Sequence, residues 1–125
     1  MLWAAAGFFA LLVMVDRPVS VVVVVPESLR HAESVSLRME GVVMRRDAPA
    51  TWNVFWDRQD DAHFVGYVSS PANSSLHDPK PANFILQLPV AAVAALHRQK
   101  EMRFTFVPVR KLPEGGVTMT TLRLE

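Results

Sequence analysis

Apolar and polar residues alternate along much of this 125-residue chain, and this period of two predicts β-strands. The clearest case is the stretch Thr51–Trp56, which carries three large aromatic side chains in six residues. Aromatic residues favour strands and need a broad apolar surface to pack against. We therefore predict a central strand whose aromatic side chains belong to the core rather than to a ligand platform. Its two faces are Trp52, Val54 and Trp56 on one side, and Asn53 and Phe55 on the other.

Six further stretches have the composition of strands. Val19–Val25 is almost entirely valine, and a short run that is apolar on both faces predicts a strand covered on both sides. Pro89 precedes the alanine-rich stretch Val90–Leu96, which predicts one short helix because proline suits a first helical position. The fold class is therefore mainly β, with about seven antiparallel strands in a sandwich or jelly-roll-like barrel. The other predicted strands are Val35–Met44, Phe64–Ser69, Phe84–Leu88, Arg103–Val109 and Val117–Leu124.

Glycines mark places where the strand pattern changes. The apolar positions of Val35–Met44 shift phase at Gly41, which is typical of a β-bulge. Gly66 lies among large residues, and we predict that a neighbouring aromatic side chain packs closely against it. Pro113–Gly116 predicts a hairpin between the last two strands, because glycine adopts positive φ readily. In Phe64–Ser69, simple alternation places Phe64, Gly66 and Val68 on one face, and Val65 and Tyr67 on the other.

The apolar N-terminal stretch Met1–Val15 fits three interpretations. As a helix it would reach about 22 Å, which is short of the roughly 30 Å hydrocarbon core of a bilayer. A secretory signal has a basic start and a small-residue cleavage site, whereas this stretch has no basic residue and ends in Met14-Val15. It can be a linker remnant, a signal-like or anchor-like segment in contact with a membrane, or a strand or helix of the fold. We divide the chain into this apolar N-terminal segment, residues 1–17, and a β-sandwich domain, residues 18–125.

Composition excludes several classes of protein. The chain has 13 Lys and Arg residues against 12 Asp and Glu residues, whereas a nucleic-acid-binding protein needs a strong positive field. It has no cysteine, which excludes disulfides, thiolate metal sites and cysteine nucleophiles. We therefore expect no nucleic-acid partner.

No catalytic constellation is visible in the sequence. No two histidines have the spacing of three or four residues that places both imidazoles on one helix face. Asp60 and Asp61 lie next to His63 and resemble a metal cluster, but a solvated turn is the simpler interpretation. The serine pairs, Ser69-Ser70 and Ser74-Ser75, lack the pattern of a nucleophile elbow. We expect no catalytic residue, no metal ligand and no cofactor in this chain. Its histidines are His31, His63, His77 and His97.

A series of short motifs occurs in a characteristic order and spacing. In this order, residues 18–125 resemble the C-terminal domain of plant-type polyphenol oxidases (catechol oxidase/tyrosinase). The Lys-Phe-Asp-Val motif of that family is replaced here by Thr51-Trp52-Asn53-Val54, which keeps an aromatic residue and the valine and has an amide for the carboxylate. The motifs around it are Val19–Val25 with Pro26, Met39-Glu40-Gly41-Val42 with Arg46-Asp47, Phe64-Val65-Gly66-Tyr67-Val68, Phe104–Pro108 and Val117–Glu125.

The resemblance implies a small β-sandwich or jelly-roll domain that follows a copper-binding catalytic domain. In the latent enzyme this domain lies over the dicopper site, and its displacement opens the site to phenols. The family holds its copper pair with six histidines on a helical bundle, which this chain lacks, so the resemblance implies a covering role and not oxidase activity. The expected partner is a polyphenol oxidase catalytic domain, on the same or a separate chain. The family-motif positions are Thr51, Trp52, Asn53, Val54, Phe64 and Gly66, and Leu76 is the candidate for a side chain that plugs the copper site.

The chain departs from the family pattern at three places, which are the name motif, the N-terminus and the Lys- and Glu-rich loop after the first strand, here reduced to Glu27–Ser34. The Lys and Asp of the name motif are replaced, so any ion pair between them is absent here, and Met1–Val15 fits neither the family's catalytic domain nor its linker. The resemblance implies a plastid location, in the thylakoid lumen. The secretory pathway is the alternative, and there Asn73-Ser74-Ser75 would be an acceptor for N-glycosylation.

Two other functions are compatible with the same residues. The first is a free-standing β-sandwich module that binds a phenolic or sugar ligand through Tyr67 and the long loop Pro71–Ala82. The second is an accessory protein tethered to a membrane by Met1–Val15.

Overall fold

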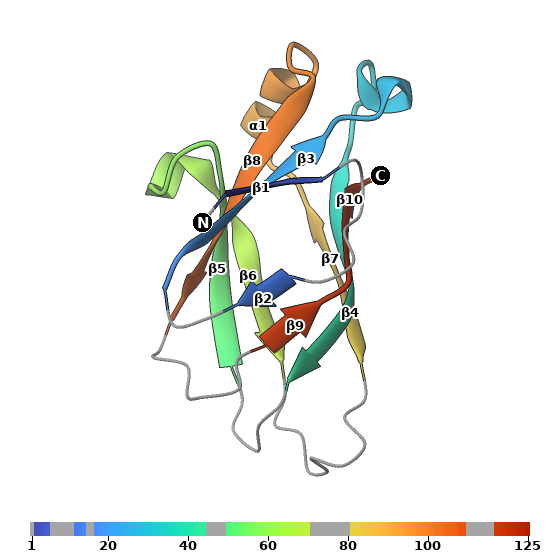
Figure 1. Cartoon of the computed structure of the whole chain (residues 1–125). Coiled ribbons are helices and arrows are strands. Elements are labelled where there is room, and N and C mark those ends of the chain that lie inside the picture. Colours follow the sequence, from blue (N-terminus) through green and yellow to red (C-terminus); the bar gives the residue numbers. More distant parts are fainter. Residues whose placement is uncertain (1, 6–11, 15–16, 45–49, 71–80, 110–116) are drawn as a thin grey trace.

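A computed structural model of the chain describes residues 2–5, 12–14, 17–44, 50–70, 81–109 and 117–125 (Figure 1). These residues form strands, one α-helix and two short 3-10 turns. The strands are β1 (Leu2–Ala5), β2 (Leu12–Met14), β3 (Val19–Val24), β4 (Ser36–Met44), β5 (Ala50–Trp56), β6 (Phe64–Ser70), β7 (Ala82–Gln87), β8 (Glu101–Pro108), β9 (Val117–Met119) and β10 (Thr121–Leu124), and the helical segments are η1 (Glu27–Leu29), η2 (Asp61–His63) and α1 (Val90–Leu96).

The strands build two sheets that face each other, so the predicted mainly β, sandwich-like fold is confirmed (Figure 1). The first sheet has the strand order β1-β3-β8-β5-β6. The second has the order β10-β4-β9-β2, and β7 pairs with β4 from Ser36 to Val42. All pairs are antiparallel except β1 with β3. Within the described residues the two sheets do not close into a barrel. The predicted helix begins and ends at the expected residues.

The core lies between the two sheets, and β5 is central to it as predicted. It lies between β8 and β6, and Trp52, Val54 and Trp56 are buried on its inner face. Helix α1 covers one end of the core. The other buried apolar side chains among the described residues are Val19, Val21, Val23, Val68, Met102, Phe104 and Phe106 in the first sheet, Leu37, Met39, Val42, Met119, Leu122 and Leu124 in the second, Ala92, Val93 and Leu96 in α1, and Val25, Val35 and Leu88 next to strand ends.

The β-bulge predicted at Gly41 is confirmed. The pairing of β4 with β7 shifts register between Met39 and Val42, and Gly41 has a φ of +66°. Opposite this bulge the predicted last strand is divided at Thr120 into β9 and β10. The Thr120 backbone N–H and hydroxyl both donate to the Glu40 carbonyl oxygen, each at 3.2 Å. The bulge therefore sets the place where the last strand bends.

Three expectations about packing were wrong in part. Leu86 of β7, not an aromatic residue, packs closely against Gly66. The strands β8 and β9 pair within different sheets, so they do not form the hairpin expected between them. The predicted valine strand has its second face only partly covered, because Val24 is 42% exposed. Each of these features depends on contacts between residues far apart in the chain.

The apolar N-terminal stretch contributes one strand to each sheet. The strand β1 pairs in parallel with β3, and β2 pairs with β9. Among the described residues, no helix has the length and apolar character needed to cross a membrane. The division into residues 1–17 and 18–125 stays a prediction.

We predict that Gly41→Ala destabilises the fold. A Cβ atom at this position would lie 2.0 Å from the Thr120 hydroxyl oxygen. The alanine would also have to adopt the left-handed backbone conformation of Gly41. The left-handed conformation alone costs about 1–2 kcal/mol for a residue with a side chain. Denaturant unfolding should therefore show that the free energy of unfolding falls by more than this backbone cost.

Gly66→Ala is the matched control. Its Cβ would meet only the tip of the Leu86 side chain, at 3.2 Å, and this tip can move. Equal losses of stability in the two variants would contradict the account of the bulge.

Candidate interaction surface

The family-motif positions do not converge on one site, because strand alternation divides them between two faces. Trp52 and Val54 are buried in the core, whereas Thr51 and Asn53 lie half-buried on the outer face of the first sheet. Gly66 lies beneath Leu86, between the two sheets. The candidate plug residue, Leu76, falls outside the described residues.

Phe64 lies on the opposite face of β6 from the one predicted. Val54 pairs with Gly66 and Phe55 with Phe64, so the register between β5 and β6 shifts by one residue at Val65. This irregularity turns Val65 towards the core, against which it packs, and Phe64 towards the outside. Simple alternation across Phe64–Ser69 missed the extra residue, since no glycine or proline occupies it.

The outer face of β5 and β6 carries a group of aromatic side chains. The Phe55 and Phe64 ring centroids lie 5.7 Å apart at an interplanar angle of 68°, an edge-to-face geometry that aromatic pairs prefer. Tyr67 is 65% exposed and pairs in register with Asn53. We call Asn53, Phe55, Phe64 and Tyr67 the aromatic face.

Hydroxyl groups border the aromatic face. Thr51 Oγ1 lies 3.0 Å from Ser69 Oγ at one end of it. On the neighbouring strands, Thr105 Oγ1 lies 2.9 Å from Ser20 Oγ. At the Phe55–Phe64 end, the exposed turn residues Asp57, Arg58 and Asp60 add charge to this border. Aromatic residues with a polar rim are typical of the surfaces through which proteins bind partners.

The turn between β5 and β6 holds the flanking aromatic residues in place. Asp60 caps the short helical turn η2 by accepting a 3.0 Å hydrogen bond from the His63 backbone N–H, and its carboxylate also contacts His63 Nδ1 at 2.5 Å. The His63 ring packs against the Trp56 ring at an interplanar angle of 54°, with centroids 4.5 Å apart. His63 Nε2 is 4.0 Å from an Asp57 carboxylate oxygen. The predicted solvated turn is therefore an ordered, capped turn that links β5 to β6.

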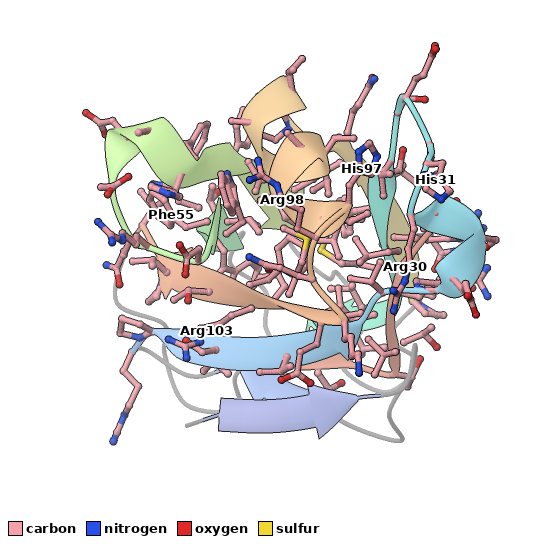
Figure 2. The ribbon with its side chains drawn as sticks, turned by 90° about the horizontal axis from the view of Figure 1, so that it is seen from above. Arg30, His31, Phe55, His97, Arg98 and Arg103 are labelled. Carbon is pink, nitrogen blue, oxygen red and sulfur yellow. The ribbon has the colours of Figure 1, made fainter. Side chains whose placement is uncertain are left out.

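The described residues do not fit a copper or other metal site. In this part of the chain, no three His, Asp or Glu side chains are grouped so as to hold a metal ion. His31 and His97 are exposed at the end of the molecule formed by η1 and α1, whereas Phe55 lies well away from both (Figure 2). His97 Nε2 is 2.7 Å from the Ala32 carbonyl oxygen, so this imidazole joins α1 to the segment after η1. His77 falls outside the described residues.

The outer face of the second sheet is charged and internally paired. The Glu40 carboxylate lies 3.2 Å from Arg38 and 3.1 Å from Arg123, and the Glu125 carboxylate lies 3.2 Å and 3.7 Å from the same two guanidinium groups. Hydrogen bonding to Glu125 raises the pKa of Arg38. The two outer faces of the sandwich therefore differ in chemistry: one is aromatic and the other is a network of ion pairs.

Solved structures of other proteins contain the same fold. The chain superposes on a structure of latent apple tyrosinase with a TM-score of 0.67 and 21% sequence identity, over 98% of this chain and 28% of that one. It has the fold of part of a latent polyphenol oxidase. The match extends into the N-terminal segment, beyond residues 18–125, to which the sequence motifs were confined.

Two structures of latent aurone synthase, another polyphenol oxidase, agree with this match. The protein from its natural source and a recombinantly expressed form each give 14% identity and a TM-score of 0.63, over 90% and 91% of this chain respectively. The chain spans only about a quarter of the length of these proteins. No protein-family model and no curated protein matches the sequence. The polyphenol oxidase resemblance is thus confirmed at the level of the fold.

We predict that Asp60→Asn destabilises the chain at pH 6 and that this loss shrinks in acid. The hydrogen bond from the His63 side chain lowers the pKa of Asp60 in the folded chain. The ionised carboxylate therefore stabilises the fold above the unfolded aspartate pKa, about 3.9, and this contribution is lost as the pH falls through the lower folded value. Thermal unfolding midpoints of both proteins should be recorded from pH 6 to pH 2.5.

Asp61→Asn removes the same charge from the next residue and is the control. It should lower the midpoint less than Asp60→Asn does at pH 6. A gap between wild type and Asp60→Asn that stays constant down to pH 2.5 would show that the carboxylate does not act through its ionised form.

Proposed function

We propose that this chain is a non-catalytic C-terminal domain of a polyphenol oxidase, which covers the dicopper active site of the catalytic domain and keeps the enzyme latent. The observation that carries the proposal is the fold match, which takes in 98% of this chain but only 28% of latent apple tyrosinase. A match of these proportions is what one domain of a larger enzyme gives. The apple tyrosinase and aurone synthase structures compared above are each described as latent.

A covering domain acts by excluding substrate. It needs a rigid body and a surface that binds the catalytic domain, and it needs no reactive group of its own. The two packed sheets supply the rigid body, and β5 supplies both core and surface. In this proposal the copper ions belong to the catalytic domain, on the same or a separate chain.

A second candidate function is the binding of a small phenolic compound or a sugar. The exposure of Tyr67, 65%, beside Phe64, 40%, favours it, because aromatic rings stack on flat ligands. Titration with catechol or a glycan, followed by tryptophan fluorescence, tests this function directly. Saturable quenching at micromolar ligand would support it.

We predict that the chain inhibits a polyphenol oxidase catalytic domain from which the original C-terminal domain has been removed. The initial rate of catechol oxidation should fall in a saturable manner as the chain is added, because docking excludes substrate. The chain alone should retain no stoichiometric copper after dialysis and should not oxidise catechol. Chain unfolded by heat provides the control for non-specific effects.

A fused form makes the test more sensitive. A short flexible linker raises the effective concentration of the chain to about the millimolar range, so the fusion should be latent even where the separate chain binds weakly. Cleavage of the linker, followed by dilution, should restore the rate. A fusion as active as the free catalytic domain, or copper retention with catechol turnover by the chain alone, would refute the proposed function.

A further inference from the structure

The two outer faces of the sandwich differ in whether their side chains already have partners within the same face. On the second sheet, Arg38 and Arg123 are paired with Glu40 and Glu125 within the same face. Charges that are already paired lose solvation on docking and gain little in return. Ile85 is a large apolar side chain on this face, 56% exposed, and its partner in register is the charged Arg38. This face is therefore poorly suited to a stable interface.

The aromatic face has the opposite character. Tyr67 and Phe64 expose 65% and 40% of their surface, and their neighbours in register, Asn53 and Phe55, carry no charge. The cores of protein interfaces are enriched in aromatic residues and depleted of charged ones, and tyrosine is frequent among the residues that dominate binding energy. The hydroxyl pair of Thr51 and Ser69 provides a polar rim.

Two rings of the aromatic face, Phe55 and Phe64, are held in place before any partner binds. Strand β5 is hydrogen-bonded on both sides, to β8 and to β6. Phe64 follows directly after the turn that Asp60 and His63 cap, and its ring packs edge-on against Phe55. Side chains fixed in this way lose little conformational entropy on binding, which favours affinity.

We infer that the aromatic face is the surface by which this chain docks on the polyphenol oxidase catalytic domain, with Tyr67 as its central anchor. This inference rests on the proposed function. The occupant is indicated by length: the match leaves about three quarters of each latent polyphenol oxidase outside the matched fold. A body of that size on the same polypeptide reaches a sheet face at high effective concentration.

The test compares two single variants in the inhibition assay with the separate catalytic domain. Tyr67→Ala removes the most exposed ring of the aromatic face, and Ile85→Ala removes an exposed apolar side chain from the other sheet. Loss of a central interface tyrosine costs tenfold or more in affinity. The concentration for half-maximal inhibition should therefore rise at least about tenfold for Tyr67→Ala relative to wild type. For Ile85→Ala it should rise less than about twofold. Thermal unfolding of each variant establishes that it is folded.

The possible results separate this inference from the proposed function. In one contrary result the wild-type chain inhibits and Tyr67→Ala inhibits equally well; in another, Ile85→Ala weakens inhibition more than Tyr67→Ala does. Either result overturns the aromatic face as the docking surface but is compatible with the covering role. An absence of wild-type inhibition in both the separate and the fused forms overturns both. Full inhibition by Tyr67→Ala together with loss of catechol quenching would assign the aromatic face to small-ligand binding instead.

Discussion

Burial of the inner face of β5 is the constraint on which the rest of the structure depends. Trp52 is 1% exposed and Trp56 7% exposed, and Phe104 and Phe106 of β8 are buried beside them. Because side chains alternate along a strand, fixing the tryptophans inside fixes Asn53 and Phe55 outside. A slip of one residue would exchange the two faces. The core thus decides which side chains remain available to a partner.

The fold uses irregularities in its strands to adjust this strict alternation. At Gly41 a bulge with φ +66° bends β4, and Thr120 bends the opposing strand at the same point. At Val65 a second irregularity moves Phe64 to the outside, where it meets Phe55. The bulge at Gly41 shapes the second sheet, and the irregularity at Val65 completes the aromatic face. Local changes of register, rather than additional elements, therefore set the surface chemistry of this sandwich.

The sequence predicted what depends on local chemistry and missed what depends on long-range pairing. Aromatic alternation located β5, the alanine-rich run after Pro89 located α1, and the phase change located the bulge at Gly41. The irregularity at Val65 was missed because it carries no glycine of its own. The separation of β8 and β9 into different sheets depends on partners far along the chain, which turn residues do not reveal. Alternation correctly placed Tyr67 on the opposite face of β6 from the buried Val68, but it placed Phe64 on the wrong face.

The central claim is that one face of β5 builds the core and the other, with β6, binds a catalytic domain. Tyr67 is the only tyrosine of the chain, so its chemical reactivity reports on the aromatic face alone. The most direct measurement is tyrosine nitration of the chain, free and mixed with excess copper-free catalytic domain, with the peptide that contains Tyr67 quantified by mass spectrometry. The account predicts rapid nitration of Tyr67 in the free chain and protection in the complex. An equal rate of nitration with and without bound catalytic domain would contradict it.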